Sequence, residues 1–421
     1  MDKFVINGGK PLKGKLKVSG AKNASLALLP ACILAPGKSR LQNTPELNDV
    51  FTMIKLLKHM GANISFEDHV IEISTAGIND LTAPYEHVKK MRASVYVLGP
   101  LLARYGQAKV SLPGGCAWGP RPINLHLEAL TKMGAQIDLV DGYIVAKARR
   151  LNGANIYFDI SSVGATGNTV MAATLAKGTT VINNAAIEPE ITNLVKFLVL
   201  MGAKIEGEGT NTLVIEGIDE LNAVEVLTIP DRIEAGTLLI AAAMTQGSIT
   251  LENIDPNLII AILSKLESAG CKIEILDRSI KLDASTLEIK PTDVSTAIFP
   301  GFPTDMQAQW TAFMSLAKGI SSVKDTIYFD RFKHVPELVR LGADISVNEN
   351  TAIIKGVKDL HGAKVMSTDL RASASLVLAG IAAKGTTEVL RVYHLDRGYQ
   401  RIEEKLKSLG ADIERVEGKE Y

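Results

Sequence analysis

A short sequence phrase recurs six times along the chain, with its glycines about 70 residues apart. Each copy has an apolar residue at the end of a predicted helix, then a glycine, a small residue, a variable position and an isoleucine. A fixed period of this kind indicates an architecture of repeated supersecondary units. The six copies are Met60–Ile64, Met133–Ile137, Met201–Ile205, Ala269–Ile273, Leu341–Ile345 and Leu409–Ile413.

Every repeat has the same predicted order of elements. A helix with apolar residues at helical spacing precedes the phrase, the glycine suits a left-handed C-cap, and the isoleucine begins a strand. About 40 residues before each phrase glycine lies another helix, whose Ala, Leu and Val content predicts burial. Examples of the buried helix are Ala24–Leu34, Thr169–Ala176, Thr237–Met244 and Ala374–Ala383.

The N-terminal segment is predicted to complete the last repeat, which stops at Tyr421 without its second strand. Phe4–Gly9 and Lys17–Gly20 match Ala352–Gly356 and Lys364–Ser367 of the fifth repeat. We therefore expect the first and last segments of the chain to lie together.

Six repeats group most simply as two lobes of three. Lobe one is predicted to span residues 21–229, and lobe two residues 1–20 plus 230–421. The two places where the chain crosses between the lobes are expected to form a hinge. The cleft between such lobes is the expected ligand site.

Charge and cysteine content restrict the possible partners. The 46 acidic and 46 basic residues cancel, so no chain-wide basic field attracts nucleic acid or a membrane surface. An anionic ligand would then need a local cluster of Arg and Lys. Three cysteines and an N-terminus without signal-peptide features predict a cytoplasmic protein without a disulfide framework. Cys32 and Cys271 fall in predicted structural positions.

The stretch Leu112–Pro122 is a predicted loop, because its glycines and prolines suit neither a helix nor a central strand. It carries Cys116 and Arg121. A thiol beside a guanidinium on a loop is a candidate catalytic group. The alternative is a turn with an incidental cysteine, since free cysteines are often small buried hydrophobes.

Polar residues recur at the N-terminal tips of the buried helices and before the second helices, so they are expected to converge on one region. Helix N-termini also favour anions. Asp231, Asp369 and Ser162 are equally well explained as N-caps. The tip residues are Lys22, Asn23, Arg92, Ser162–Gly164, Asp231, Arg232, Asp305 and Asp369–Arg371, and the connections add Cys116, Arg121, Glu188, Arg331 and Arg397.

Metal and nucleotide-cofactor motifs are missing from the sequence. Its seven histidines show no pairing at ligand spacing, and it has no CxxC, P-loop, dinucleotide fingerprint or GxSxG. We therefore expect neither a metal nor a cofactor.

Four motifs, in order, resemble those of the UDP-N-acetylglucosamine 1-carboxyvinyltransferase family over essentially the whole chain. They are Ser19–Ala24, Pro113–Cys116 with Gly119–Pro122, Phe302–Gln309 and Thr368–Ala374. The resemblance implies an α/β fold, a two-lobed inside-out α/β barrel with three repeats per lobe. It also implies transfer of an enolpyruvyl group from phosphoenolpyruvate to the 3′-hydroxyl of UDP-N-acetylglucosamine, through a tetrahedral ketal. This is the first committed step of peptidoglycan synthesis, and the family is the target of the epoxide fosfomycin.

The resemblance also implies roles for individual residues. Cys116 would donate a proton to C3 of phosphoenolpyruvate, and Asp305 would take the hydroxyl proton, with Lys22 and Arg397 as further catalytic residues. Lys22, Arg121 and Arg397 would bind phosphate, and Arg331 and Arg371 would bind the carboxylate, with Asn23 nearby and Asp231 and Asp369 supporting. UDP-N-acetylglucosamine would contact Asn23, Arg92, Arg121, Pro122, Ile123, Asn124, Leu125, Ser162, Val163, Gly164, Asp305 and Ile327.

Two positions depart from the family pattern. Asn48 and Ile160 stand where many relatives have lysine, which weakens the expected charge around the substrate. Within this resemblance Cys116 could also attack C2, and the two roles pull its pKa in opposite directions, because donation needs the thiol and attack needs the thiolate. The alternatives are 5-enolpyruvylshikimate-3-phosphate synthase, which lacks the cysteine loop, and a non-catalytic paralogue that senses UDP-sugar.

Overall fold

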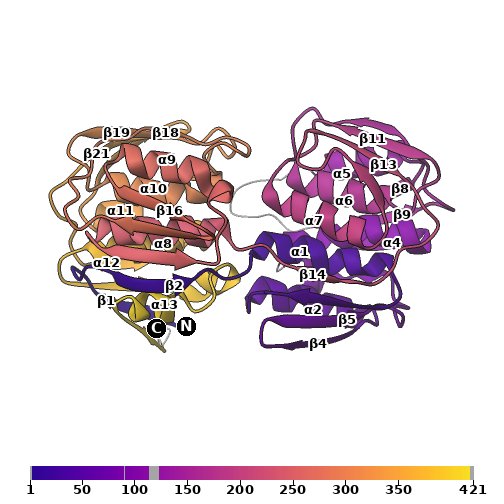
Figure 1. Cartoon of the computed structure of the whole chain (residues 1–421), viewed down its shortest axis with the longest axis horizontal. Coiled ribbons are helices and arrows are strands. Elements are labelled where there is room, and N and C mark those ends of the chain that lie inside the picture. Colours follow the sequence, from indigo (N-terminus) through magenta and orange to yellow (C-terminus); the bar gives the residue numbers. More distant parts are fainter. Residues whose placement is uncertain (1, 90, 113–122, 418–421) are drawn as a thin grey trace. The chain divides into compact units, whose positions relative to one another are not determined.

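The computed structural model describes residues 2–89, 91–112 and 123–417 (Figure 1). The chain forms two compact lobes. Lobe one is Gly20–Ile229, and lobe two consists of residues up to Ser19 together with those from Pro230 onward. The first boundary therefore falls between Ser19 and Gly20, one residue before the predicted position.

Over the described residues, the strands form six four-stranded sheets, three in each lobe. In lobe one the sheet orders are β14-β3-β5-β4, β6-β7-β9-β8 and β10-β11-β13-β12. Its strands are β3 (Lys38–Gln42), β4 (Asn63–Glu67), β5 (Val70–Ser74), β6 (Thr82–Ala83), β7 (Gln107–Ser111), β8 (Gln136–Val140), β9 (Tyr143–Lys147), β10 (Asn155–Tyr157), β11 (Thr179–Asn183), β12 (Lys204–Glu206), β13 (Thr212–Glu216) and β14 (Glu225–Leu227).

The sheets of lobe two repeat this order as β16-β17-β15-β2, β18-β19-β21-β20 and β22-β23-β1-β24. In each sheet, one edge strand is parallel to its neighbour, and the other neighbouring pairs are antiparallel. The strands are β1 (Lys3–Asn7), β2 (Lys13–Lys17), β15 (Ser248–Glu252), β16 (Lys272–Leu276), β17 (Ser279–Asp283), β18 (Val294–Ser295), β19 (Ile320–Lys324), β20 (Asp344–Asn348), β21 (Thr351–Lys355), β22 (Lys364–Met366), β23 (Thr386–Leu390) and β24 (Asp412–Val416).

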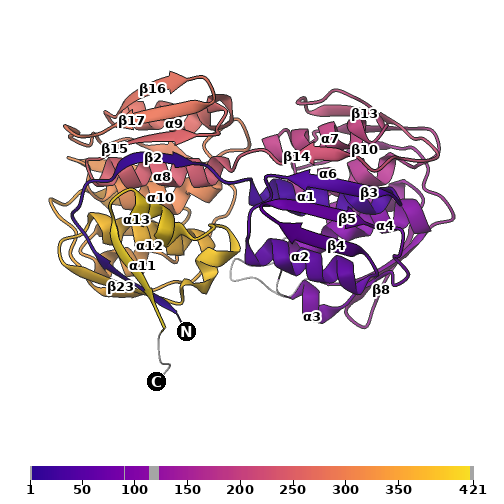
Figure 2. The same cartoon turned by 60° about the horizontal axis from the view of Figure 1, so that its bottom comes forward.

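Helices fill the interior of each lobe, and the sheets lie outside them (Figures 1 and 2). The helices of lobe one are α1 (Lys22–Ala31), η1 (Cys32–Leu34), α2 (Asn48–His59), α3 (Tyr85–Val88), η2 (Arg92–Val97), α4 (Leu98–Tyr105), α5 (Asn124–Lys132), α6 (Val163–Ala173) and α7 (Pro189–Leu200). Those of lobe two are α8 (Arg232–Met244), η3 (Pro256–Ile259), α9 (Ile260–Ser268), η4 (Thr304–Met306), α10 (Gln307–Met314), α11 (Val335–Arg340), α12 (Leu370–Ala382), η5 (Val392–Arg397) and α13 (Ile402–Ser408).

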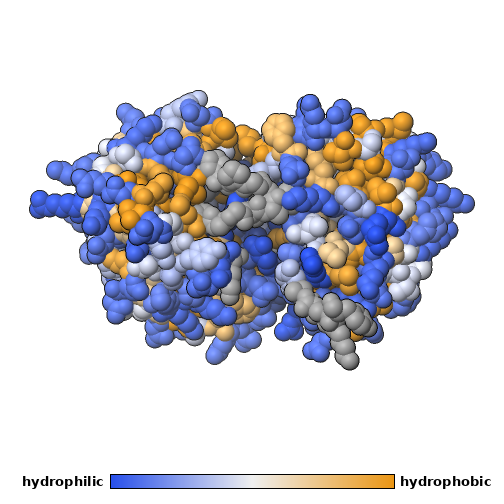
Figure 3. Space-filling view, turned by 180° about the vertical axis from the view of Figure 1, so that it is seen from behind, coloured by the Kyte–Doolittle hydropathy of each residue, from blue (hydrophilic) through white to orange (hydrophobic). Residues whose placement is uncertain are grey.

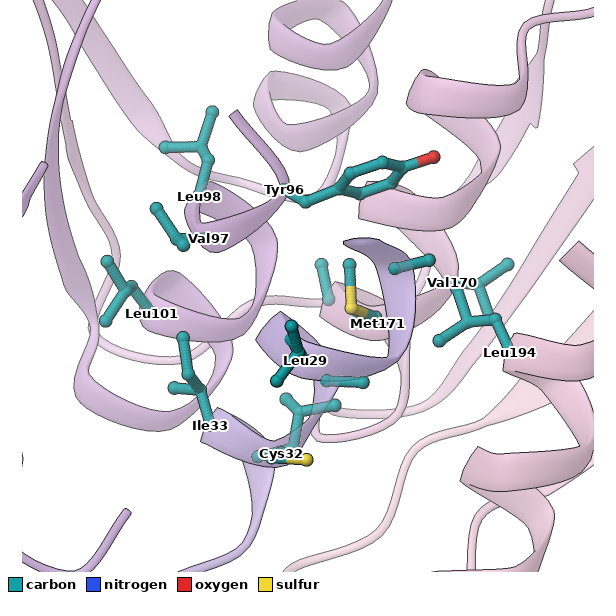
Figure 4. Close-up of a cluster of buried hydrophobic side chains, with 14 of the residues drawn as sticks. Leu29, Cys32, Ile33, Tyr96, Val97, Leu98, Leu101, Val170, Met171 and Leu194 are labelled. Atoms are coloured by element: carbon teal, nitrogen blue, oxygen red, sulfur yellow. The ribbon is translucent and has the colours of Figure 1, made fainter. Parts of the chain in front are cut away.

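Burial explains why the sheets are outside. Strands such as β9 and β13 bury alternate residues, so only one face of each sheet meets the core. Every residue of α8 and of α10 is buried, so these helices are surrounded on all sides. Each lobe has its own apolar core, and Figure 4 shows part of the core of lobe one, with Leu29, Met171 and Leu194.

The two cysteines that the structure describes belong to these cores. Cys32 is drawn in Figure 4, and Cys271 occupies the small-residue position of the repeated phrase. Burial raises the pKa of each thiol to about 12, which leaves it protonated and unreactive at neutral pH.

All six phrase glycines adopt the left-handed conformation, with φ between +92° and +108°. Each glycine and the residue after it donate the same pair of hydrogen bonds, which ends the preceding helix. In the third repeat, the N–H of Gly202 donates to Val199 O and that of Ala203 donates to Leu198 O, both at 2.9 Å. This Schellman motif turns the chain sharply from the helix into the next strand. The glycines are Gly61, Gly134, Gly202, Gly270, Gly342 and Gly410.

The N-terminal segment supplies the strand that the sixth repeat lacks, as the sequence match predicts. Strand β1 lies between β23 and β24 and is antiparallel to both, with Phe4 opposite Val389 and Arg415. Strand β2 continues into the neighbouring sheet, where it is parallel to β15. The two ends of the chain therefore join in lobe two.

The surface of both lobes is mixed in polarity. On the face in Figure 3, hydrophilic side chains cover most of the surface, and apolar ones form smaller patches on each lobe. Among the described residues, no helix is long and apolar enough to cross a membrane.

The Gly202 turn allows a test that separates backbone strain from steric clash. A side chain there would meet only Asn222 Nδ2 at 3.9 Å, so the cost of Gly202→Ala comes from the left-handed φ of +107°. We expect this variant to lose about 1–2 kcal/mol of unfolding free energy in urea, followed by circular dichroism. Gly202→Asn is the control and should lose less, because Asn tolerates this conformation. Equal losses for Ala and Asn would contradict the assignment.

Candidate active site

In lobe two, the carboxylate of Asp305 lies between two arginines from different repeats. Asp305 Oδ1 is 2.9 Å from Arg331 Nη2, and its Oδ2 is 2.7 Å from Arg371 Nη2. Asp305 is in η4, Arg371 is in α12, and Arg331 follows β19. The side chains of Arg331 and Arg371 are 8% and 4% exposed, whereas that of Asp305 is 26% exposed. The side chains of both arginines are therefore buried, and the carboxylate of Asp305 is partly exposed to solvent.

Arg371 is held by charges and by an aromatic ring. Burial alone would lower its pKa, but the charge of Asp305, with contributions from Tyr399 and Asp231, holds that pKa above its ordinary value. The guanidinium lies 5.4 Å from the centroid of the Tyr399 ring. Arg371 is thus a permanent cation, suited to binding a carboxylate or phosphate.

A buried hydrogen-bond network lies beneath this cluster. The Tyr399 hydroxyl is 3.0 Å from Thr237 Oγ1, and Gln309 Nε2 donates to both of them at 3.1 Å. Gln309 also donates to the carbonyl of Asp305 at 3.0 Å. This network joins α8, α10 and the segment after η5, so it fixes the helices that carry the charged side chains.

Three residues that the sequence left as either ligands or caps are helix caps in the structure. Asp231 accepts from the N–H groups of Ile233 and Glu234 at the start of α8. Asp369 caps α12, and Ser162 caps α6. Asp231 also acts at a distance, because its charge raises the pKa of Arg371.

Arg397 and Ile327 also belong to lobe two. Arg397 is the last residue of η5. Burial and the charge of Arg397 lower the pKa of His394. Ile327 lies in the segment between β19 and α11, and its N–H donates to Asp325 Oδ1 at 2.9 Å.

In lobe one, Lys22 is the first residue of α1, where a cation opposes the helix dipole. Its Nζ is 3.7 Å from Asp49 Oδ2 in the first turn of α2, and both side chains are largely buried. Asn23 follows it in α1, and Asn48 begins α2. Asp49 therefore offsets the cost of placing Lys22 at a helix N-terminus.

The N-terminus of α6 packs closely against His126, which is neutral. A side chain added at Gly164 would lie 3.0 Å from His126 Nε2. Asn168 Oδ1 accepts from Gly99 N, so the Asn168 amide donates to His126 Nδ1 at 2.9 Å. Burial lowers the pKa of His126 to about 4. The neutral imidazole therefore carries its proton on Nε2, beside the start of α6.

The remaining predicted residues of lobe one come from elements that pack on one another. Helix η2 packs against α1 and α6, and α5 packs against α6. Arg92 begins η2, Ile123 precedes α5, and Asn124 and Leu125 begin α5. Cys116, Trp118, Arg121 and Pro122 lie outside the described residues.

Sequence reasoning missed the neutral and buried parts of these sites. Tyr399, Thr237 and His126 stand in no short motif, and their roles depend on partners far away in the sequence. Thr304 lies inside the motif Phe302–Gln309, but nothing in that motif distinguishes it from its neighbours. Among the described residues, no group of three or more His, Cys, Asp or Glu side chains is arranged to hold a metal ion.

Comparisons with known proteins agree on one family. The family profile described as EPSP synthase (3-phosphoshikimate 1-carboxyvinyltransferase) matches residues 6–406. A protein of Chloroherpeton thalassium named UDP-N-acetylglucosamine 1-carboxyvinyltransferase is 59% identical, over 99% of this chain and 97% of its own. A protein of Chlorobium limicola with the same name is 56% identical over the full length of both.

Solved structures show the same fold. The enolpyruvyl transferase NikO from Streptomyces tendae matches with a TM-score of 0.90 at 25% identity, covering 99% of both chains. An EPSP synthase from Acinetobacter baumannii matches with a TM-score of 0.76 at 19% identity, covering 99% of this chain and 100% of the other. The predicted enolpyruvyl transferase fold is therefore confirmed.

His126 gives the stability of the protein a predictable pH dependence. Its pKa is about 4 when folded and 6.5 in its ordinary state, so the unfolded chain takes up this proton first as pH falls. Stability should then fall between pH 6.5 and 4, by up to about 1.4 kcal/mol per pH unit for this one proton. Urea unfolding of His126→Gln should show a slope shallower by this amount. The same slope in the variant and the parent protein would contradict the buried neutral state.

Proposed function

The chain belongs to the EPSP synthase family of enolpyruvyl transferases, and we propose that it acts as a UDP-N-acetylglucosamine 1-carboxyvinyltransferase. It would transfer the enolpyruvyl group of phosphoenolpyruvate to the 3′-hydroxyl of UDP-N-acetylglucosamine and release phosphate. The observation that carries the proposal is Asp305 between Arg331 and Arg371. A carboxylate base beside two cations that can bind a second carboxylate is what this chemistry requires. The name shared by the full-length relatives selects the acceptor.

The reaction is an addition followed by an elimination. The 3′-oxygen of the sugar bonds to C2 of phosphoenolpyruvate while C3 gains a proton, which gives a tetrahedral ketal. The bond from C2 to the phosphate oxygen then breaks, and C3 loses a proton to restore the double bond. No electron is gained or lost overall, so the reaction needs no redox cofactor.

We assign the charged residues by the charges that the donor carries. Phosphoenolpyruvate has about three negative charges, and the chain has no net charge, so the cations must be focused locally. Arg331 and Arg371 would bind the carboxylate. Lys22, Arg121 and Arg397 would bind the phosphate, with Asn23 beside Lys22.

Proton transfer would use two groups of different kinds. Asp305 would accept the proton of the attacking hydroxyl, and Cys116 would deliver a proton to C3. A carboxylate is a weak base toward an alcohol, so this transfer must accompany the attack on C2. Cys116 must be a thiol to donate the proton, whereas attack on C2 would require a thiolate.

The sugar nucleotide would be bound mainly by lobe one. The N-terminus of α6, at Ser162–Gly164, offers backbone N–H groups and a favourable dipole to a diphosphate. Arg92 and the segment Arg121–Leu125 would contact the nucleotide, and Arg121–Pro122 would enclose the uracil. Asp305 and Ile327 would contact the sugar from lobe two. We place the protein in the cytoplasm, at the first committed step of peptidoglycan synthesis.

The function is tested by phosphate release with each acceptor. We expect release to require both phosphoenolpyruvate and UDP-N-acetylglucosamine. Release with shikimate 3-phosphate instead would identify the sister activity, 5-enolpyruvylshikimate-3-phosphate synthase. A folded protein that binds UDP-N-acetylglucosamine but releases no phosphate would be a non-catalytic sensor, and the proposal would be wrong.

The proton-donor role of Cys116 predicts which replacements are tolerated. Cys116→Asp should keep measurable turnover, because a carboxylic acid can donate a proton, whereas Cys116→Ser should lose about 100-fold or more, because a hydroxyl is a far weaker acid. Treatment with fosfomycin should add one epoxide mass to the parent protein and none to Cys116→Asp. An adduct on Cys32 or Cys271 would refute the assignment.

A further inference from the structure

The residue after the first strand of a repeat has a structural duty in most of the repeats. In four of them it is a left-handed residue, with φ between +55° and +60°. In three of these, an asparagine amide donates to the carbonyl that follows the parallel edge strand, at 2.7–3.1 Å. The four residues are Asn43, Asn184, Asn253 and Arg391.

Repeat five departs from this arrangement. It has no left-handed residue after β19, and the chain continues directly with Asp325, whose N–H donates to Asn350 O at 2.9 Å. In repeat two the corresponding bond joins the N–H of half-buried Leu112 to Gly142 O, and in three further repeats it belongs to buried residues without charge. These residues are Thr44, Ala185 and Ile254.

The bond to the edge strand is made by a different residue in repeat five. The hydroxyl of Thr326 donates to the carbonyl of Thr296, the residue after β18, at 2.5 Å. The contact with the edge strand therefore does not depend on a carboxylate at position 325. Burying one is costly unless hydrogen bonds compensate for the lost hydration.

Asp325 is fully buried, and four donors converge on its carboxylate. Oδ1 accepts from the N–H groups of Ile327 and Tyr328, both at 2.9 Å, and from the Thr296 hydroxyl at 2.8 Å. Oδ2 accepts from the hydroxyl of Thr304 at 2.7 Å. Asp325 thus fixes both the segment after β19 and the residue immediately before Asp305.

Thr304 passes this constraint to Arg331. Its hydroxyl gives its proton to Asp325, which leaves its oxygen lone pairs for Arg331 Nη1 at 2.9 Å. Asp305 binds the other nitrogen, Nη2. The backbone N–H of Tyr328 also donates to Asp325, and the centroid of the Tyr328 ring lies 5.6 Å from the same guanidinium. Arg331 therefore has two independent polar anchors.

We propose that Thr304 and Asp325 are positioning residues that keep Arg331 aimed at the donor carboxylate when Asp305 turns to the attacking hydroxyl. This rests on the proposed function, in which Asp305 serves as the base. Its carboxylate cannot neutralise both arginines and also take a proton from the sugar, so its bond to Nη2 is temporary. The Thr304 bond to Nη1 survives this exchange. Through Ile327, the same carboxylate also sets a backbone contact of the sugar nucleotide.

The test compares three threonine variants by the Kd for phosphoenolpyruvate, measured by calorimetry, which needs no turnover. Thr304→Val should raise this Kd about tenfold, the scale of one lost hydrogen bond to a charged group. Thr304→Ser keeps the hydroxyl and should stay within about twofold of the parent. Thr326→Val is the matched control in the same repeat: it should lower the melting temperature and leave the Kd unchanged.

A second variant tests the buried carboxylate itself. Asp325→Asn replaces one carboxylate oxygen by an amide, so Thr304 loses its acceptor or Ile327 loses one of its partners. The Kd for phosphoenolpyruvate should rise as in Thr304→Val, and the KM for UDP-N-acetylglucosamine should rise as well, with kcat changed less than either.

The outcomes separate this proposal from the proposed function. An unchanged Kd in Thr304→Val, or a Thr304→Ser variant as weak as Thr304→Val, would overturn the positioning role even if the parent protein turns over. If the parent binds phosphoenolpyruvate but does not turn over with UDP-N-acetylglucosamine, the proposed function fails, and the Kd comparison still decides the role of Thr304. A parent that does not bind phosphoenolpyruvate would overturn both.

Discussion

The constraint on which this fold depends is that every repeat contains a helix that is buried over most of its length. Such a helix must be surrounded, so the strands bury only one face and close around it. Six left-handed glycines provide the sharp turns that this winding requires. Lys22 and Arg371 of the candidate site lie in the first turns of such helices, and Asp305 lies just before one.

Two repeats of lobe two depart from the arrangement that the others share, and one of these departures is next to the candidate site. The sixth repeat takes a strand from the N-terminus, which brings the two ends of the chain together in lobe two. The fifth repeat has no left-handed residue at this point and buries Asp325, whereas Thr44, Ala185 and Ile254, which make the corresponding backbone bond in three other repeats, carry no charge. That exception is connected through Thr304 to the pair of Asp305 and Arg331. Because a buried carboxylate is costly, we propose that this departure is retained for the candidate site that it supports.

Periodic and local features could be predicted from the sequence, and contact-dependent ones could not. The glycine turns and the borrowed strand follow from spacing and from matches between repeats. The roles of Asp231 and Asp369 were undecidable, because an aspartate at a helix start looks the same as a cap or as a ligand. The Asp325–Thr304 and His126–Asn168 contacts join residues 21 and 42 positions apart, and no short motif marks them. Such contacts are visible only when the packing brings distant segments together.

The central claim is that the bond broken in phosphoenolpyruvate joins carbon to oxygen. It is tested most directly with phosphoenolpyruvate that carries ¹⁸O in the oxygen bridging C2 and phosphorus, incubated with the protein and UDP-N-acetylglucosamine. Enolpyruvyl transfer breaks the C2–O bond, so mass spectrometry should find the label in the released phosphate. Label retained in the organic product would show that the P–O bond breaks instead. That result would mean phosphoryl transfer or hydrolysis, and it would contradict the assignment of Asp305, Arg331 and Arg371 to an enolpyruvyl transferase site.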